Sequence, residues 1–145
     1  MKTLVITADD VKGGKYVGAT KLDGFDGNLE IAADLGFVYF RGSLRVTGYI
    51  RADAGSGIKA GSGIKAGEGI EAGSGIEAGM SIYAQWISCQ LRIFAGLCLW
   101  RLPKPEEQRI QIEELRSGTV AYGDLRITKG SSAASVSARE ASTYY

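Results

Sequence analysis

A six-residue phrase repeats through the middle of the chain and constrains its fold more than any other feature. Between residues 53 and 84 the pattern Ile-x-Ala-Gly-x-Gly recurs almost unchanged. Internal repetition of this kind indicates one short structural unit that stacks on copies of itself. The isoleucines stand six residues apart and each is followed two residues later by an alanine: Ile58, Ile64, Ile70, Ile76 and Ile82, then Ala60, Ala66, Ala72, Ala78 and Ala84.

Each unit is expected to be a very short β-strand followed by a corner. In Ile-x-Ala the two apolar side chains are two residues apart, so an extended backbone points both inward and the middle residue outward. The glycines permit a positive φ and place no Cβ in the corner. Helix is excluded because each glycine costs about 1 kcal/mol relative to alanine, and because a period of six does not match 3.6. We predict an all-β fold, a single-stranded β-solenoid (β-helix) with an N-terminal β cap and a C-terminal β-hairpin.

The outward residues of the repeat leave the size of one coil open. They read Lys59, Lys65, Glu71, Glu77 and Tyr83. A coil of two units (12 residues) would stack Lys59 on Glu71 and Lys65 on Glu77. A coil of three units (18 residues) would stack Lys59 on Glu77 and Lys65 on Tyr83. Charge pairing slightly favours the smaller coil, but an exposed pair contributes only about 0–1 kcal/mol, so both sizes remain open.

The repeat is expected to extend backward through looser strands. Counting six residues at a time from Ile58 reaches three apolar residues, Ala52, Val46 and Phe40. Short runs separated by glycines fill the chain before them, and the first 20 or so residues are expected to cap the open end of the solenoid.

We expect a single domain over residues 1–128. It would consist of regular repeats at about 53–84, longer strands at 87–100, a linker at 102–107 that holds both prolines, and terminal strands at 109–127. Residues 129–145 contain too little apolar surface for a core, so we expect a flexible tail there.

The segment after the repeat alternates apolar and other residues, which predicts strands with one apolar face. Some outward residues are also large and apolar: Phe94 and Trp100, with Trp86 nearby. They are expected either to be covered by the C-terminal segment or to form an exposed patch that binds a partner, and coverage is favoured because an open end must be capped. The predicted inward residues are Ile87, Cys89, Leu91, Ile93, Ala95, Leu97 and Leu99.

Composition indicates the compartment and excludes several kinds of partner. The net charge is +1, from 17 basic and 16 acidic residues, so no global field would attract nucleic acid. The N-terminus does not read as a signal peptide, and residues 86–99 are too short and too polar to cross a bilayer. We expect a cytoplasmic protein of a bacterial host cell, with no membrane contact, and with Cys89 and Cys98 as reduced thiols.

Candidate catalytic chemistry is scarce. The chain has no histidine, which removes the usual nucleophile activators, zinc ligands and general base. Hexapeptide-repeat acyltransferases, which form left-handed β-solenoids, typically use a histidine base and therefore match poorly. The phrase Gly55-Ser-Gly57-Ile-Lys-Ala60 resembles a dinucleotide fingerprint but lacks the flanking strand and helix that such a site needs. We expect no enzyme activity, no cofactor and no metal.

Two resemblances bear on function. The glycine-spaced strands from Gly27 to Ile31 and from Gly42 to Ala52 resemble those of bactofilins, which implies a cytoskeletal scaffold that polymerises end to end. The repeat, together with Leu91–Trp100 and Ser117–Gly123, is similar to small uncharacterised proteins of bacteriophages and mobile elements. Such genes often encode inhibitors of host defence, including anti-CRISPR proteins. This second resemblance brings no residue roles with it.

The favoured hypothesis is a non-enzymatic binding protein that blocks a host protein or ribonucleoprotein complex by protein–protein contact. The alternative is a bactofilin-like self-assembling scaffold, and a homodimer also remains open. A preorganised β surface with charged ladders and flanking aromatic residues can bind without a large ordering cost. The candidate partner-binding residues are Lys59, Lys65, Glu68, Glu71, Glu77, Trp86 and Trp100.

Overall fold

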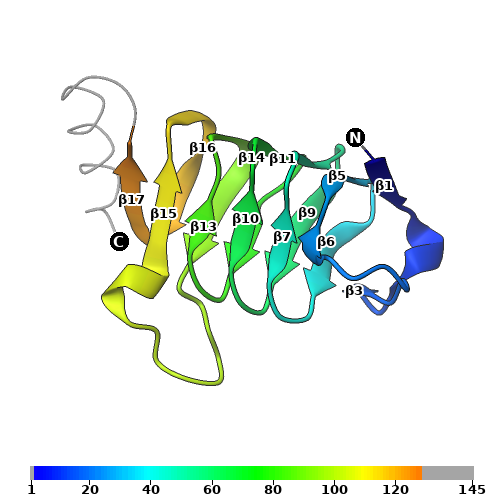
Figure 1. Cartoon of the computed structure of the whole chain (residues 1–145), viewed down its shortest axis with the longest axis horizontal. Helices are drawn as coiled ribbons and strands as arrows, with labels where there is room; N and C mark the ends of the chain where they lie inside the picture. The colour runs from blue at the N-terminus through cyan, green and yellow to red at the C-terminus, as the bar shows by residue number, and fades with distance from the viewer. Residues whose placement is uncertain (1, 129–145) are drawn as a thin grey trace.

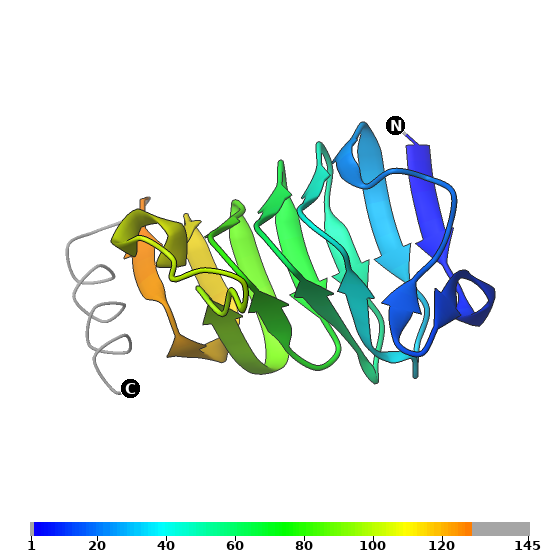
Figure 2. The same ribbon diagram turned by 90° about the horizontal axis from the view of Figure 1, so that it is seen from below.

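The chain forms a β-helix-like stack of mostly parallel strands around one apolar core (Figure 1). The computed structural model describes residues 2–128, and the predicted tail at 129–145 lies outside the described residues. Successive strands lie on three sides of the stack, which Figure 2 shows from a second direction. We call these sides faces 1, 2 and 3.

The three faces recur in the same order along the chain. Face 1 contains β1 (Lys2–Ile6), β5 (Gly27–Ile31), β8 (Ile50–Ala52), β11 (Gly69–Ala72) and the first halves of β14 (Trp86–Ala95) and β16 (Glu114–Tyr122). Face 2 contains β2 (Val11–Lys12), β3 (Lys15–Tyr16), β6 (Gly36–Phe40), β9 (Ser56–Ala60), β12 (Ile76–Ala78) and the second halves of β14 and β16. Face 3 contains β4 (Asp23–Phe25), β7 (Leu44–Val46), β10 (Ile64–Ala66), β13 (Ile82–Tyr83), β15 (Arg109–Ile112) and β17 (Asp124–Ile127). Two short 3-10 helices, η1 (Ala8–Asp10) and η2 (Pro105–Gln108), complete the described elements.

The strand register settles the size of the coil in the regular region. Ile58 pairs with Ile76, and Ile64 pairs with Ile82, so neighbouring coils there are 18 residues apart. Lys59 accordingly lies opposite Glu77, and the preference for a 12-residue coil was wrong. An exposed charge pair is worth too little to decide the coil, whereas burial of each isoleucine contributes about 1.5–3 kcal/mol.

The core consists of large and small side chains that stack in separate columns. The first inward residue of each strand is large, and the second is an alanine in most of the repeat. These residues are almost fully buried, because the three faces enclose them on every side. The large column runs, for example, through Leu29, Ile50, Ile70 and Ile87 on face 1, through Val38, Ile58, Ile76 and Ile93 on face 2, and through Leu44, Ile64, Ile82 and Ile110 on face 3.

The backward extension of the repeat is confirmed for burial, with a shift in its register. Ala52, Val46 and Phe40 are buried, but they align with the alanines of the later units and not with Ile58 and its copies. The unit around Gly55 is two residues longer than the others, since Ile50 and Ile58 are eight residues apart. Gly55 has a φ of +80° there, which lets the chain make the wider corner.

The other corner glycines serve a different purpose from the one expected. Gly61, Gly67, Gly73 and Gly79, which open the corners, all have ordinary negative or extended φ values. A Cβ on Gly67 would lie 2.0 Å from the carbonyl oxygen of Thr47 on the preceding coil, and one on Gly73 would lie 2.2 Å from that of Asp53. These corners therefore require glycine because neighbouring coils approach closely, and the expected need for positive φ was wrong at these positions.

Residues before β5 close the N-terminal end of the core, as the expected β cap would. Strands β2 and β3 pair antiparallel through the turn at Gly13 and Gly14, and η1 lies beside them. The side chains of Ile6 and Leu22 are buried against the core, and the ring of Tyr16 packs 5.5 Å from that of Phe40. Leu29 and Val38 are consequently inaccessible to solvent.

The C-terminal β-hairpin is absent from the described residues, and this prediction was wrong. Strand β15 pairs in parallel with β13 and β17 on face 3, while β16 pairs in parallel with β14. The two runs thus continue the coil instead of folding back on each other. Ser117 and Gly118, predicted as a turn between strands, form part of a bulge within β16.

The alternation after Ile87 was right only as far as the strand remains on one face. Ile87, Cys89, Ile93 and Ala95 are buried, but Leu91 is 57% exposed. β14 turns from face 1 to face 2 at this point, so the corner interrupts the alternation. Leu97 and Leu99 lie beyond the strand, in a loop that spans residues 96–108 and projects from the stack in Figure 1.

The close approach at the corners predicts unequal costs for two alanine substitutions. Gly67→Ala should lower the free energy of unfolding by about 1–3 kcal/mol, because its methyl group would meet a backbone carbonyl at 2.0 Å. This exceeds the gain of about 0.4–1 kcal/mol that alanine brings by restricting the unfolded chain. Gly63→Ala, whose nearest contact would be 3.2 Å, should cost less. Urea unfolding followed by circular dichroism measures both, and equal stabilities would contradict the argument.

Candidate functional site

The predicted partner-binding residues are divided among different sides of the molecule. Lys59 and Glu77 are neighbours on face 2, whereas Lys65 lies on face 3 between Arg45 and Tyr83. One flat surface of a partner therefore could not cover the whole predicted set. Trp100 belongs to the projecting loop, and only Glu68, Glu71 and Trp86 are brought together, at face 1.

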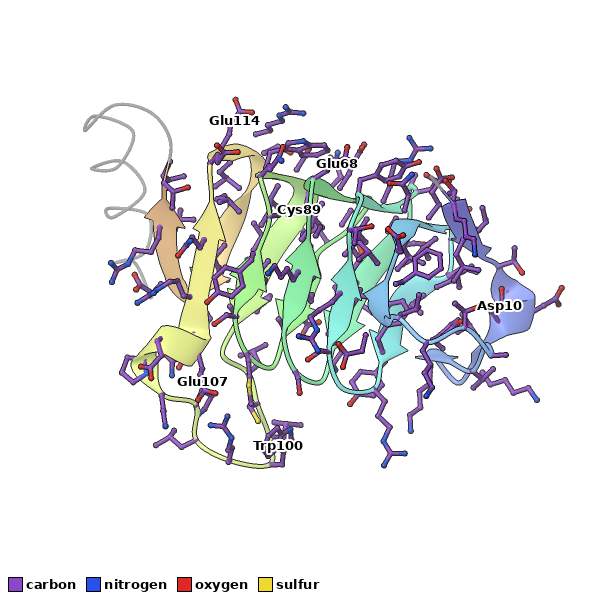
Figure 3. All side chains as sticks on the ribbon, in the orientation of Figure 1. Asp10, Glu68, Cys89, Trp100, Glu107 and Glu114 are labelled. Carbon is purple, nitrogen blue, oxygen red and sulfur yellow. The ribbon has the colours of Figure 1, made fainter. Side chains whose placement is uncertain are left out.

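Glu68, Glu71 and Trp86 line a pocket of about 180 Å³ at one edge of face 1. Its other lining residues are Tyr49, Ile50 and Arg51 from β8 and the turn before it. We call it the Tyr49–Trp86 pocket. Figure 3 shows Glu68 and Glu114 along this side of the ribbon, and Trp100 and Glu107 on the opposite side.

The pocket exists because a glycine lies between two aromatic residues on consecutive coils. Gly69 pairs with Trp86 on one side, and Tyr49 precedes Ile50, the residue that pairs with Ile70 on the other side. The ring of Trp86 leans over Gly69, where an added Cβ would lie 1.9 Å from Cε2 of the indole. The hydroxyl of Tyr49 donates a hydrogen bond of 2.5 Å to Glu30 of β5, so this side chain extends away from Gly69.

Face 2 provides a comparison within the same chain. The ring of Phe37 lies over Gly57 and reaches Gly75 of the following coil, with added Cβ atoms 2.9 Å and 3.2 Å from its carbons. A single aromatic ring thus fills the space above both glycines. On face 1 the two rings point in different directions, and the space between them stays open.

Charges around the Tyr49–Trp86 pocket are unbalanced. The guanidinium of Arg51 lies 3.6 Å from carboxylates of Glu30 and of Asp53. Glu68 and Glu71 form no ion pair with any residue of the described chain, although Glu71 pairs in register with Arg51. The hydrogen bond to Glu30, together with partial burial, raises the pKa of Tyr49, so its hydroxyl keeps its proton and remains a donor.

Trp86 is held from the side opposite Gly69 by Arg116. The guanidinium carbon of Arg116 lies 4.2 Å from the centre of the indole ring, and its Nε donates a hydrogen bond of 2.6 Å to Glu114. A cation over an indole contributes about 0.5–1 kcal/mol at an exposed site. This contact fixes one wall of the pocket before any ligand arrives.

The projecting loop forms a second surface, with apolar side chains at its tip. Leu99 is 99% exposed, Trp100 64% and Leu102 88%. The loop's first residues are bonded to the stack, since the backbone N–H groups of Leu97 and Cys98 donate to the carbonyls of Ala78 and Gly79. The prediction that Trp100 is covered finds no support in the described residues, while the alternative of an exposed patch fits its exposure.

An ion pair ties the tip of the loop to its return. Arg101 donates hydrogen bonds of 2.7 and 2.5 Å to the two carboxylate oxygens of Glu107, and its guanidinium lies 5.1 Å from the ring of Trp100. These bonds, with a further one from the backbone N–H of Lys104, lower the pKa of Glu107 to about 2. Glu107 is therefore charged at any pH near neutrality, and the tie is permanent there.

The described residues contain no arrangement typical of catalysis or metal binding. Within residues 2–128, no group of three or more Cys, Asp or Glu side chains could hold a metal ion. Burial raises the pKa of the Cys89 thiol, which makes it a poor nucleophile, and Cys98 is a partly exposed free thiol. None of the helices in this part of the chain is long and apolar enough to cross a membrane.

Comparison with known proteins adds no information about the site. We found no match to the chain among protein-family models, curated proteins or solved structures.

Sequence reasoning found half of the Tyr49–Trp86 pocket and missed the rest. Tyr49 and Arg51 precede the regular repeat and were not considered, because contact between residues 49 and 86 depends on coils of unequal length. The corner pair Gly67–Gly69 gave no sign that an aromatic ring would cover the second glycine. Leu99 was assigned to the core, and Leu102 to a linker.

The lean of Trp86 over Gly69 predicts a spectroscopic effect of a single methyl group. In a Trp100→Phe background, in which Trp86 is the only tryptophan, Gly69→Ala should displace the indole into solvent. Its fluorescence should shift to longer wavelength and its quenching by acrylamide should increase. Gly63→Ala in the same background is the control, since no ring lies over Gly63. An unchanged spectrum in the Gly69 variant would show that the indole does not depend on this glycine.

Proposed function

We propose that the chain is a non-enzymatic binding protein that acts by protein–protein contact. The observation that carries the proposal is the projecting loop at residues 96–108, which exposes Leu99, Trp100 and Leu102 together. Large apolar side chains grouped on a surface are typical of interaction sites, and tryptophan is enriched among the residues that dominate binding energy.

The attachment of the loop supports the same function. Backbone hydrogen bonds fix its start to β12 and the turn after it, and η2 with the Arg101–Glu107 ion pair fixes its return. The hydroxyl of Ser81 also donates to the carbonyl of Glu106. A loop held at both ends loses less conformational entropy on binding than a free one, so more of its contact energy appears as affinity.

For the partner, we propose a protein or ribonucleoprotein complex of a bacterial host's defence, of the kind that anti-CRISPR proteins inhibit. This part of the proposal rests on the similarity to small phage and mobile-element proteins and places the protein in the host cytoplasm. The scarcity of candidate catalytic groups in residues 2–128 fits inhibition by contact better than inhibition by chemistry.

The proposal predicts that the tip of the loop is required for inhibition. In bacteria with an active CRISPR system, the wild-type protein should restore plasmid transformation or plaque formation. Leu99→Ser combined with Trp100→Ala should abolish this effect, because loss of two central anchors costs at least about 2 kcal/mol each, or roughly 30-fold each in affinity. Circular dichroism should show an unchanged fold.

A matched control uses an exposed leucine at another corner. Leu91→Ser removes a comparable apolar side chain that lies between faces 1 and 2 and outside the loop, and this variant should inhibit normally. Equal loss of inhibition in both variants would contradict a specific role for the loop. Absence of inhibition by the wild-type protein across defence systems of several types would contradict the proposed partner.

The self-assembling scaffold remains the second candidate, and one feature argues against it. End-to-end assembly needs open strand edges and an accessible core at both ends, but η1 and the β2–β3 pair cover the core at the N-terminal end. We therefore expect static light scattering to give a constant mass, that of a monomer or a dimer, across a wide concentration range. A mass that grows with concentration, with filaments in the electron microscope, would favour the scaffold.

A further inference from the structure

We propose that the Tyr49–Trp86 pocket binds the charged end of a basic side chain, lysine or arginine, presented by a partner polypeptide. The inference rests on the proposed function, because it takes the ligand to be part of a protein. It adds a second contact, of different chemistry and on a different side of the stack from the projecting loop.

The size of the pocket fits one side-chain end. Its volume of about 180 Å³ is several times the roughly 30 Å³ of a water molecule, so more than a single water can enter. It is smaller than the roughly 300–1,000 Å³ of sites that enclose a drug-sized molecule. A single ammonium or guanidinium group with part of its aliphatic stem matches this intermediate size.

The charges of the lining select a cation. Arg51 is the one cationic side chain that lines the pocket, and Glu30 and Asp53 flank its guanidinium at 3.6 Å. Glu68 and Glu71 are left as two carboxylates without an ion-pair partner in the described chain. An anion would meet two uncompensated negative charges, whereas a guanidinium or ammonium group would neutralise them.

The apolar part of the lining selects a cation with an aliphatic stem. Tyr49, Ile50 and Trp86 supply aromatic and aliphatic walls beside the two carboxylates. Lysine and arginine place their methylene groups along apolar surface and keep the charged end near oxygen atoms. A bare metal ion is a poorer fit, because no cluster in residues 2–128 offers three or more suitable ligands.

The chain itself forms such a contact one coil further along. Arg116 lies 4.2 Å over the face of the same Trp86 and is hydrogen-bonded to Glu114, which combines a guanidinium, an indole and a carboxylate. A ligand in the Tyr49–Trp86 pocket would repeat this chemistry with Glu68 and Glu71 as the carboxylates. Because Arg116 and the Tyr49–Glu30 hydrogen bond hold the two walls, the pocket is already open.

The experiment uses Trp86 as its own reporter. In the Trp100→Phe protein, Trp86 is the only tryptophan and its fluorescence is titrated with N-acetyl-arginine methylamide and N-acetyl-lysine methylamide. N-acetyl-norleucine methylamide, which has an aliphatic stem and no charge, is the neutral probe. We expect a saturable change with a Kd of about 1–10 mM for at least one cationic probe, as is reasonable for one isolated side chain. The neutral probe should give no saturable change.

Two sets of variants test the role of the carboxylates. Glu68→Gln with Glu71→Gln should weaken binding of the cation at least tenfold, and 0.5 M NaCl should weaken binding to the wild-type pocket because the carboxylates are exposed. Asp9→Asn, which makes the same chemical change at an exposed site on η1, should bind as the wild type does. Equal binding of the norleucine probe, or unaltered binding by the double glutamine variant, would overturn the inference.

A further arm distinguishes a polypeptide ligand from a free amine. A capped alanine peptide with one central arginine should bind at least as tightly as methylguanidinium does. Stronger binding of free methylguanidinium or methylammonium than of any peptide would overturn the polypeptide source. The inhibition assay separates this inference from the proposed function: a double glutamine variant that inhibits fully would overturn only the role of the pocket in partner binding.

Discussion

The close approach of neighbouring coils at their corners is the constraint on which the rest of the structure depends. Gly67, Gly73 and Gly79 each bring the backbone of one coil against a carbonyl oxygen of the preceding coil, leaving no room for a Cβ. Only at this separation do parallel strands on all three faces form continuous hydrogen-bond ladders, about 4.8 Å apart. The isoleucine columns then stack without gaps, and a core of small units becomes as dense as that of an ordinary domain.

Much of the fold could be predicted from the repeat, because its period reports directly on the inward side chains. Every isoleucine of the repeat is buried, as the pattern indicated. The coil size could not be predicted in the same way, since it depends on how many units close the circuit. The only sequence evidence for it, the charge order beginning at Lys59 and Lys65, carries an energy too small to decide between two closed paths.

Irregular segments were harder to predict for a related reason. Leu91 and Leu99 follow the apolar alternation, yet one lies at a corner and the other in a loop, because alternation does not record where a strand turns. The pocket shows the same limit. Trp86 and Glu71 could be named as candidates, but Tyr49 could not be joined to them without knowing that Ile50 pairs with Ile70 and Ile70 with Ile87, at separations of 20 and 17 residues.

Both candidate contacts lie where the repeat is interrupted, and the geometry of the stack explains why. Within the regular region the outward residues stand in straight columns over small corners, which leaves little concave surface. Tyr49 belongs to the looser coil before the repeat, Trp86 to the first strand after it, and the projecting loop inserts between two coils. A rigid stack of equal units supplies stability and a fixed frame, whereas recognition of one particular partner needs unequal features. In this chain the interruptions supply them, and the regular coils between hold those features at fixed positions.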